Sequence, residues 1–210
     1  YTGAGVKVAI IDTGIDYDAL DLNGLVDLSR STSFVASDDA IATAFFPSRN
    51  KVTDFNGHGT NVATQVSSKA VVFAGVTSKT KLIGVKVLGA DGHGSTSGVL
   101  NGVLWAADHG ADVANMSLGS SFAKAGSGGF VGFVNRVFNY ASSKGMLIVV
   151  AAGNAAADLD HNGNVVDAYC NMTHVVCVSA VGPALATDDP NSVAFYTNFG
   201  RSAIDVAGPG

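Results

Sequence analysis

The chain has 210 residues, of which 47% are hydrophobic and 14% are charged, and its net charge is −5. This size and hydrophobic content suit one α/β domain, or at most two small ones, and they exclude a disordered chain. The sequence has no cluster of Lys and Arg and no apolar stretch of membrane-spanning length, so we expect neither a nucleic-acid partner nor a membrane partner.

The N-terminal part of the chain begins with a strand and continues as loops. Residues 6–11 are nearly all apolar and rich in β-branched side chains, which predicts a buried parallel strand that ends at Asp12. Residues 16–53 hold scattered acidic side chains between short apolar groups. We interpret them as surface loops with one short strand near residues 33–36.

A histidine between two glycines follows these loops. Apolar residues at helical spacing come directly after His58, so this side chain is expected at the start of a helix. A histidine in a glycine-rich turn is more often structural than functional, and His58 alone does not indicate chemistry. Short apolar runs predict two further strands, at residues 71–76 and 82–88.

The second half of the chain alternates helices and strands. Thr96 or Ser97 can cap a helix whose apolar face runs to Ala107, and Gly110 suits its end. Residues 130–141 carry apolar side chains at i, i+3, i+4, i+7, i+8 and i+11, which predicts a second helix. The remaining apolar runs predict strands at residues 113–116, 146–152, 175–181 and 204–207. This alternation predicts an α/β fold, a doubly wound and mostly parallel sheet with helices on both faces.

The two cysteines, Cys170 and Cys177, lie close together in the sequence. No Cys-x-x-Cys motif or histidine cluster completes a metal-ligand set, so we favour a local disulfide over a metal site. A disulfide would place the protein in an oxidising compartment, as a secreted or extracellular protein. Two buried free thiols are the alternative.

Three polar side chains stand at the ends of predicted elements: Asp12, His58 and Asn154. The carboxyl ends of parallel strands meet at one edge of a sheet, so distance in sequence does not keep them apart. A carboxylate bonded to one imidazole nitrogen orients the ring and stabilises its protonated form. A side-chain amide can stabilise a developing oxyanion. Together they would provide a base with its orienting carboxylate and a donor for an oxyanion.

Five motifs in order along the chain resemble the subtilisin-like serine protease family, the subtilases. The motifs are Val-Ala-Ile-Ile-Asp-Thr-Gly (8–14), Asn-Gly-His-Gly-Thr (56–60), Val-Lys-Val-Leu-Gly-Ala-Asp-Gly (85–92), Asn-Met-Ser-Leu-Gly (115–119) and Val-Ala-Ala-Gly-Asn (150–154). The resemblance implies a subtilisin-like fold, with residues 1–210 as the N-terminal portion of one peptidase domain that is incomplete at its C-terminus.

The resemblance also implies roles for individual residues. Asp12 matches the triad aspartate, His58 the general base and Asn154 the oxyanion donor. A polypeptide substrate would bind as an added β-strand between two segments, above a specificity pocket with room for a large apolar side chain. The implied substrate-binding residues are Gly92, His93 and Gly94 on one segment, Ser117, Leu118 and Gly119 on the other, and Ala151, Ala152 and Gly153 along the pocket.

The family's nucleophile has no match in this sequence. The family carries its serine in a Gly-Thr-Ser-Met-Ala segment, and none of the serines at 95, 97, 117 and 120 has that strand-to-helix setting. We therefore expect the serine after Gly210, and the remainder of the catalytic domain is an expected partner. The expected function is a serine endopeptidase. A non-catalytic, peptide-binding relative of the subtilases is the alternative.

The expected chemistry requires no cofactor, although a structural calcium ion remains an expectation of the resemblance. Asp21 matches an aspartate that helps to bind calcium in many members of the family. Residues 67–74, in contrast, are shorter than the family's calcium-binding loop and lack its asparagine.

Overall fold

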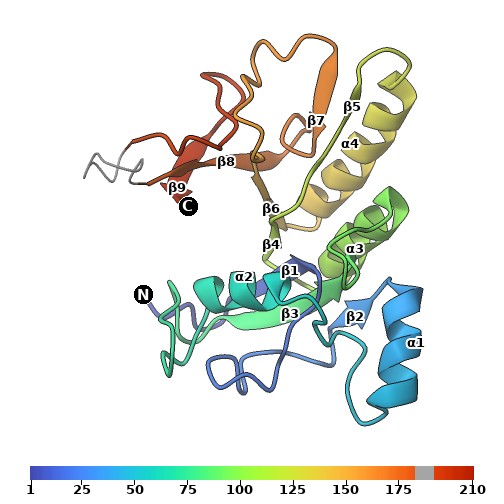
Figure 1. The fold of residues 1–210 in the computed structure, drawn as a ribbon, viewed down its shortest axis with the longest axis vertical. Coiled ribbons are helices and arrows are strands. Elements are labelled where there is room, and N and C mark those ends of the chain that lie inside the picture. Colours follow the sequence, from blue (N-terminus) through green and yellow to red (C-terminus); the bar gives the residue numbers. More distant parts are fainter. Residues whose placement is uncertain (183–191) are drawn as a thin grey trace. The chain divides into compact units, whose positions relative to one another are not determined.

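The computed structural model describes residues 1–182 and 192–210 of the chain. Its contacts divide the chain into two compact units. Unit 1 comprises residues 1–115 and 140–146, and unit 2 comprises residues 116–139 and 147–210. Figure 1 labels the helices and strands of both.

Unit 1 is built on parallel strands in the order β2-β3-β1-β4. In the register of this sheet, Val8 lies opposite Leu82 on one side and Val113 on the other. Because parallel neighbours need crossover connections, the carboxyl ends of these strands share one edge. The strands are β1 (Lys7–Asp12), β2 (Thr32–Ser33), β3 (Lys81–Lys86) and β4 (Val113–Met116).

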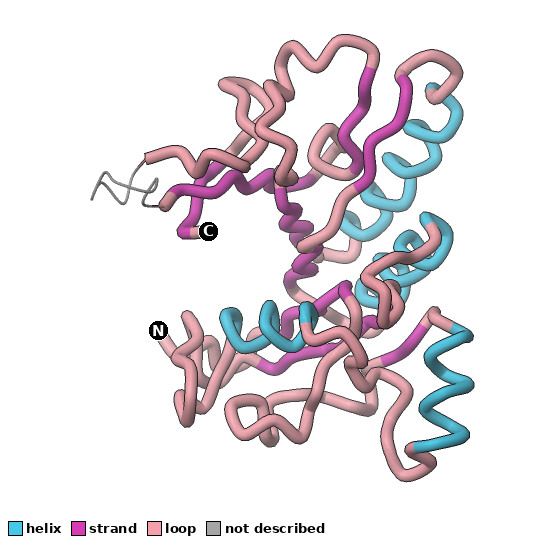
Figure 2. The backbone as a smooth tube through the Cα atoms, in the orientation of Figure 1, coloured by secondary structure: helices cyan, strands magenta, loops and turns pink. Residues whose placement is uncertain are grey.

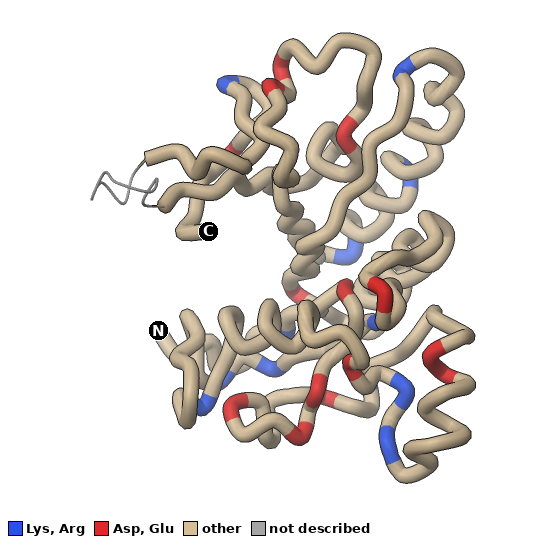
Figure 3. Tube along the Cα trace, viewed as in Figure 1, with Lys and Arg blue, Asp and Glu red and all other residues tan. Residues whose placement is uncertain are grey.

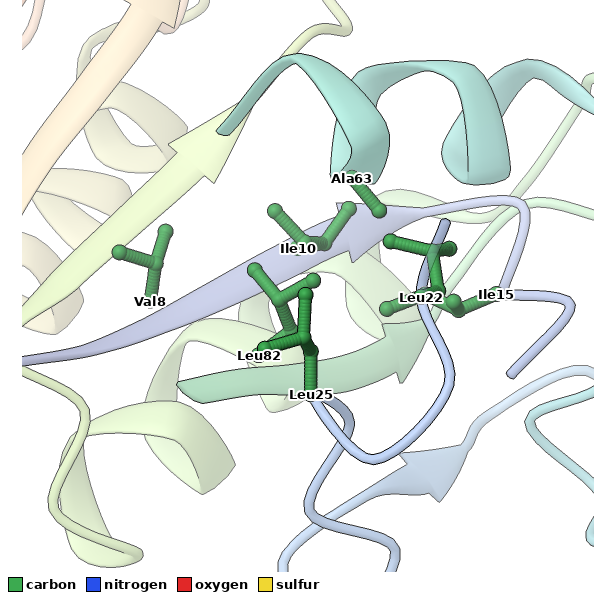
Figure 4. Close-up of a cluster of buried hydrophobic side chains, with 7 residues drawn as sticks. All are labelled: Val8, Ile10, Ile15, Leu22, Leu25, Ala63 and Leu82. Carbon is green, nitrogen blue, oxygen red and sulfur yellow. The ribbon is translucent and has the colours of Figure 1, made fainter. Parts of the chain in front are cut away.

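Helices cover both faces of this sheet, as the sequence predicts. Figure 4 shows Ala63 of α2 (His58–Val66) beside Ile10 of β1, in a buried cluster with Leu22 and Leu82. The next side chain of β1, Ile11, points the opposite way and lies beside α3 (Thr96–Asp108) at Gly102. The alternation of side chains along one strand therefore anchors two helices on opposite faces.

The prediction of loops throughout residues 16–53 is wrong for one segment, which forms α1 (Ala36–Phe45). Its alanines favour helix, and Asp38 and Asp39 in its first turn complement the positive helix N-terminus. The scattered acidic residues therefore support a helix here. The short strand expected at residues 33–36 lies at 32–33 instead.

The prediction of a strand at residues 71–76 is also wrong. This segment has no strand pairing, and its apolar side chains lie in solvent, with Val72 64% and Phe73 69% exposed. An apolar run forms a buried strand only where a neighbouring strand and a covering layer are available. Here the backbone N–H groups of the run instead bind the Asp21 carboxylate, as described below.

Unit 2 holds a second group of parallel strands and a small antiparallel pair (Figure 2). The parallel order is β6-β8-β9, with β6 (Leu147–Ala151), β8 (Val175–Val181) and β9 (Val206–Pro209). The antiparallel pair is β5 (Ser120–Ala123) with β7 (Val165–Ala168), which the sequence analysis does not predict. In this pair Ser121 lies opposite Asp167.

The long helix α4 (Gly128–Ser143) begins in unit 2 and matches the predicted helix at 130–141. Its apolar face contributes Phe130, which packs edge-on against Phe122 of β5, and Phe138, which contacts Tyr169. Two asparagines of the same helix accept hydrogen bonds from Thr173. Cys170 and Cys177 form a disulfide with their Cα atoms 5.2 Å apart, as favoured from the sequence.

Figure 3 shows Lys and Arg at separate positions, and they form no continuous basic run in the part of the chain that the structure describes. Among residues 1–182 and 192–210, no helix is both long enough and apolar enough to cross a membrane.

Candidate active site

The structure brings Asp12 and His58 together at the carboxyl edge of the unit 1 sheet. Asp12 is the last residue of β1, and His58 is the first residue of α2. Nδ1 of His58 lies 2.7 Å from Oδ1 of Asp12. When Asp12 is ionised, Nδ1 carries the ring proton and donates a hydrogen bond to the carboxylate. Nε2 then carries no proton and can accept one.

The two side chains differ sharply in exposure. The Asp12 side chain is fully buried, whereas the His58 side chain is 49% exposed. Burial raises the pKa of Asp12, although hydrogen bonds from His58 and from the Thr13 N–H oppose this shift. A buried carboxylate that holds one face of an exposed imidazole is the arrangement of a general base with its orienting partner.

Glycine at position 59 allows this contact. A Cβ atom there would lie 2.2 Å from the backbone oxygen of Gly14 and 3.2 Å from the Asp12 Cβ atom. The absence of a side chain therefore allows the start of α2 to approach the end of β1. The N–H of Gly59 also donates to Oγ1 of Thr13, which fixes the helix to the turn that follows β1.

Asp54 is a functional residue that the sequence analysis missed. Its carboxylate accepts the N–H groups of Asn56, Gly57 and Thr60 and the hydroxyl groups of Thr13 and Thr60. Burial acts to raise the pKa of Asp54, but these hydrogen bonds outweigh it and the pKa is lowered. Asp54 thereby satisfies donors at the start of α2 and holds the turn that carries His58.

Asn154 lies in unit 2, in the exposed segment after β6. The residue before it, Gly153, has φ +102°, and its carbonyl oxygen accepts the backbone N–H of Asn198. The buried Asn198 side chain accepts the N–H groups of Ala155 and Ala157 and donates to the oxygen of Ala152. Asn198 therefore braces the backbone on both sides of Asn154, a role that no local motif indicates.

Six of the predicted substrate-binding residues line one pocket of unit 2. Ser117, Leu118 and Gly119 meet Ala151, Ala152 and Gly153 around a cavity of about 310 Å³, which also includes Asn154 and Asp167 in its lining. The small side chains on one wall leave this volume open. Its size lies at the lower end of the range for ligand pockets.

The other predicted substrate segment, Gly92, His93 and Gly94, lies in unit 1. It forms the end of an exposed turn, which is closed by a hydrogen bond from the N–H of Gly89 to the His93 oxygen. The His93 side chain is 87% exposed, and its ring bonds only locally, to the oxygen of Asp91. Ser95, directly after this segment, caps α3 by accepting the Gly98 N–H, in place of the expected Thr96 or Ser97.

The surroundings of Asp21 do not fit a calcium ion. Its carboxylate accepts the successive N–H groups of Val71, Val72 and Phe73 at 2.6 to 2.9 Å. These donors occupy the face that a cation would need, and they favour an anion there. Hydrogen bonds, that from the Val72 N–H first, lower the pKa of Asp21. Among the described residues, no three His, Cys, Asp or Glu side chains form a metal-binding group.

A nucleophile for His58 is not found in unit 1. Within that unit, no serine hydroxyl lies within hydrogen-bonding distance of the His58 ring, whose bond to Asp12 uses Nδ1. The arrangement thus provides a base and its orienting carboxylate in one unit, and an amide beside a pocket in the other.

Comparison with known proteins gives consistent likenesses. A family model described as the subtilase family matches residues 3–210. Alkaline elastase YaB of Bacillus sp. (strain YaB) is 37% identical over 215 residues, which cover 100% of this chain and 47% of that protein. Subtilisin BL of Lederbergia lenta is 34% identical over 213 residues, which cover 100% of this chain and 65% of that protein.

Solved structures agree with the sequence comparisons. A cold-adapted subtilisin-like serine proteinase superposes with a TM-score of 0.72 at 29% identity, covering 100% of this chain and 64% of that one. An epidermin leader peptide processing serine protease from Staphylococcus aureus gives a TM-score of 0.78 at 27% identity, covering 98% and 52%. The predicted fold class is confirmed. The chain spans between about half and two thirds of the length of these proteins.

Proposed function

Because the chain belongs to the subtilase family, as its five motifs indicate, we propose that it acts as part of a serine endopeptidase. The observation that carries this proposal is the 2.7 Å contact between the exposed His58 ring and the buried Asp12 carboxylate. Because nearly half of the His58 side chain faces solvent, a reacting group can approach the ring. The peptidase domain proposed here extends past residues 1–210.

In the proposed reaction, a serine outside residues 1–210 is the nucleophile. Its Oγ forms a bond to the carbonyl carbon of the scissile peptide, while its proton passes to Nε2 of His58. The electrons of the carbonyl bond move to oxygen, and the resulting oxyanion accepts a hydrogen bond from the Asn154 amide. Asp12 stabilises the imidazolium that forms.

The tetrahedral intermediate then collapses. The carbon–nitrogen bond breaks, the leaving amine takes the proton from Nε2, and an acyl-enzyme ester remains. In the second half of the reaction, the oxygen of a water molecule bonds to the acyl carbon while His58 Nε2 takes one of its protons. The ester bond to the serine then breaks, and the serine Oγ takes the proton back from Nε2 as the acid product leaves. The proposed chemistry requires no metal or cofactor.

The proposed substrate is a polypeptide bound in extended form. Residues 117–119 lie between β4 and β5 and belong to neither strand, so they are a suitable edge for an added strand. We also propose Gly92, His93 and Gly94 as substrate contacts. The disulfide supports an extracellular location, since such bonds persist in oxidising compartments.

The test is labelling of the full-length protein with a fluorophosphonate, followed by mass spectrometry of the labelled peptide. We expect one labelled serine outside residues 1–210, and we expect His58→Ala to abolish labelling. His161→Ala is the matched control, because His161 is also an exposed histidine, paired with Asp158 at 2.9 Å. Folded protein that binds peptides but takes no label would contradict the proposal and favour the non-catalytic alternative.

A further inference from the structure

The pocket of unit 2 contains a carboxylate that the family resemblance does not explain. Asp167 of β7 is the only charged residue among the described residues that line it, beside Ala151, Ala152 and Gly153. With those small residues in its wall, the pocket implied by the resemblance was expected to hold a large apolar side chain. An acidic group in the lining changes which substrate side chains the pocket can accept.

The position of this carboxylate is well defined by neutral donors. Oδ1 of Asp167 accepts the hydroxyl of Ser121, its neighbour across the β5–β7 pair, at 2.7 Å. Oδ2 accepts the side-chain amide of Asn162 at 2.6 Å. Ser121 also lines the pocket, so the bond to it keeps the carboxylate at the pocket wall. Both donors are uncharged and leave the negative charge of Asp167 uncompensated.

The described part of the chain supplies no cation that pairs with Asp167. Among the described residues, no Lys, Arg or His nitrogen lies within 4.0 Å of it as an ion pair, although nine other such pairs occur. Lys124 contacts Asn162, which also binds Asp167, but the Lys124 ammonium donates to Oδ1 of Asn162 and to the oxygen of Gly163. Each carboxylate oxygen of Asp167 retains a further lone pair.

We propose that Asp167 selects substrates with a lysine or arginine immediately before the scissile bond. Asn154, the proposed oxyanion donor, lines the same pocket, so the side chain that enters belongs to the residue bearing the scissile carbonyl. The stem of Lys or Arg is apolar and suits the walls formed by Leu118 and the alanines, while its cationic head reaches the carboxylate. This inference rests on the proposed peptidase function and names its substrate class.

The test uses the full-length protein and peptides that differ only at the residue before the cleaved bond: Lys, Arg, Gln, Leu or Phe. We expect kcat/KM for Lys or Arg to exceed that for the others by roughly 10- to 100-fold. Asp167→Asn should remove most of that preference, and Asp167→Glu should retain it. Asp18→Asn is the matched control, because it removes the same charge from a carboxylate that is 60% exposed and lies outside the pocket.

Fluorophosphonate labelling and thermal melting of each variant separate the outcomes. A labelled, folded protein that prefers Leu or Phe, or that keeps its Lys and Arg preference in Asp167→Asn, overturns this inference but not the proposed function. The inference also fails, and the proposed function stands, if the protein takes the label yet cleaves none of the peptides. A folded protein that neither takes the label nor cleaves any peptide overturns both.

Discussion

Nδ1 of His58 lies 2.7 Å from Oδ1 of Asp12, although the two residues are 46 positions apart in the chain. The contact forms because β1 ends, and α2 begins, at the same edge of one sheet. Asp12 selects the tautomer in which Nε2 accepts protons, so its charge matters more than its volume.

We therefore expect Asp12→Asn to lower kcat on the order of 10⁴-fold while KM changes little, since an amide can hold the ring in the wrong tautomer. Steady-state kinetics on a peptide substrate would measure this. The free energy of unfolding of the variant should equal or exceed that of wild type, because a neutral amide costs less to bury than a carboxylate. A variant with near-native kcat would show that Asp12 does not orient the base.

Asp54 should stabilise the protein in a pH-dependent way. Its pKa is lowered in the folded state, so its contribution is fully present above about pH 4, the usual range for a free aspartate, and is lost as the pH falls through the lowered pKa. At neutral pH we expect Asp54→Asn to reduce the free energy of unfolding by about 1–3 kcal/mol, because donors at the start of α2 lose their acceptor.

Denaturant unfolding at several pH values checks this expectation. The difference between wild type and Asp54→Asn should shrink as the pH falls below about 4. Asp18→Asn, at an exposed surface ion pair with Arg49, should differ from wild type by less than about 1 kcal/mol. If the free energies of unfolding of wild type and Asp54→Asn differed by the same amount at every pH, the lowered pKa of Asp54 would be contradicted.

Asn198 should act on catalysis through Asn154. Asn198→Ala removes the bonds that brace Ala152, Ala155 and Ala157, so we expect Asn154, the proposed oxyanion donor, to lose its fixed position. We expect a fall in kcat of up to about 10²–10³-fold, the range for loss of one such donor, with a smaller change in KM. Asn135→Ala, which removes a surface contact to Thr173, is the control.

A double-mutant cycle distinguishes this positioning role from general damage. If Asn198 works through Asn154, then adding Asn198→Ala to Asn154→Ala should cost little further activity. Fully additive effects of the two substitutions would indicate that Asn198 supports the fold alone.

The disulfide should contribute stability by restricting the unfolded chain. Cys170 and Cys177 are seven positions apart, so the loop that they close is short and a contribution of about 2–3 kcal/mol is expected. The double variant Cys170→Ala, Cys177→Ala should melt at a lower temperature than wild type. A reductant should lower the melting temperature of wild type and leave that of the double variant unchanged.

The sequence predicted the parts of the site that depend on local pattern. Asp12 and Asn154 each follow an apolar run, His58 precedes one, and each lies within a short motif. The doubly wound fold follows from alternating strands and helices. Asp167 and Asn198 escaped prediction because their roles depend on distant partners: Asn198 binds residues 41 to 46 positions earlier in the chain. No local spacing encodes such a contact.

The two wrong predictions of secondary structure have a related cause. Residues 71–76 have the composition of a strand, but composition does not reveal whether a covering layer exists, and these side chains lie in solvent. At residues 36–45 the alanines and the two acidic residues of the first turn were a sufficient helix signal, and the acidic scatter of the whole region obscured it.

The loop after α2 is closed by a carboxylate of the chain itself, with Asp21 binding three successive N–H groups. We therefore expect the order of this loop to depend on the ionised state of the Asp21 carboxylate. Because the pKa of Asp21 is lowered, we expect these bonds to stabilise the loop fully above the usual pKa of an aspartate, and this stabilisation to be lost as the pH falls through the lowered pKa. We expect a chelator to leave this loop intact.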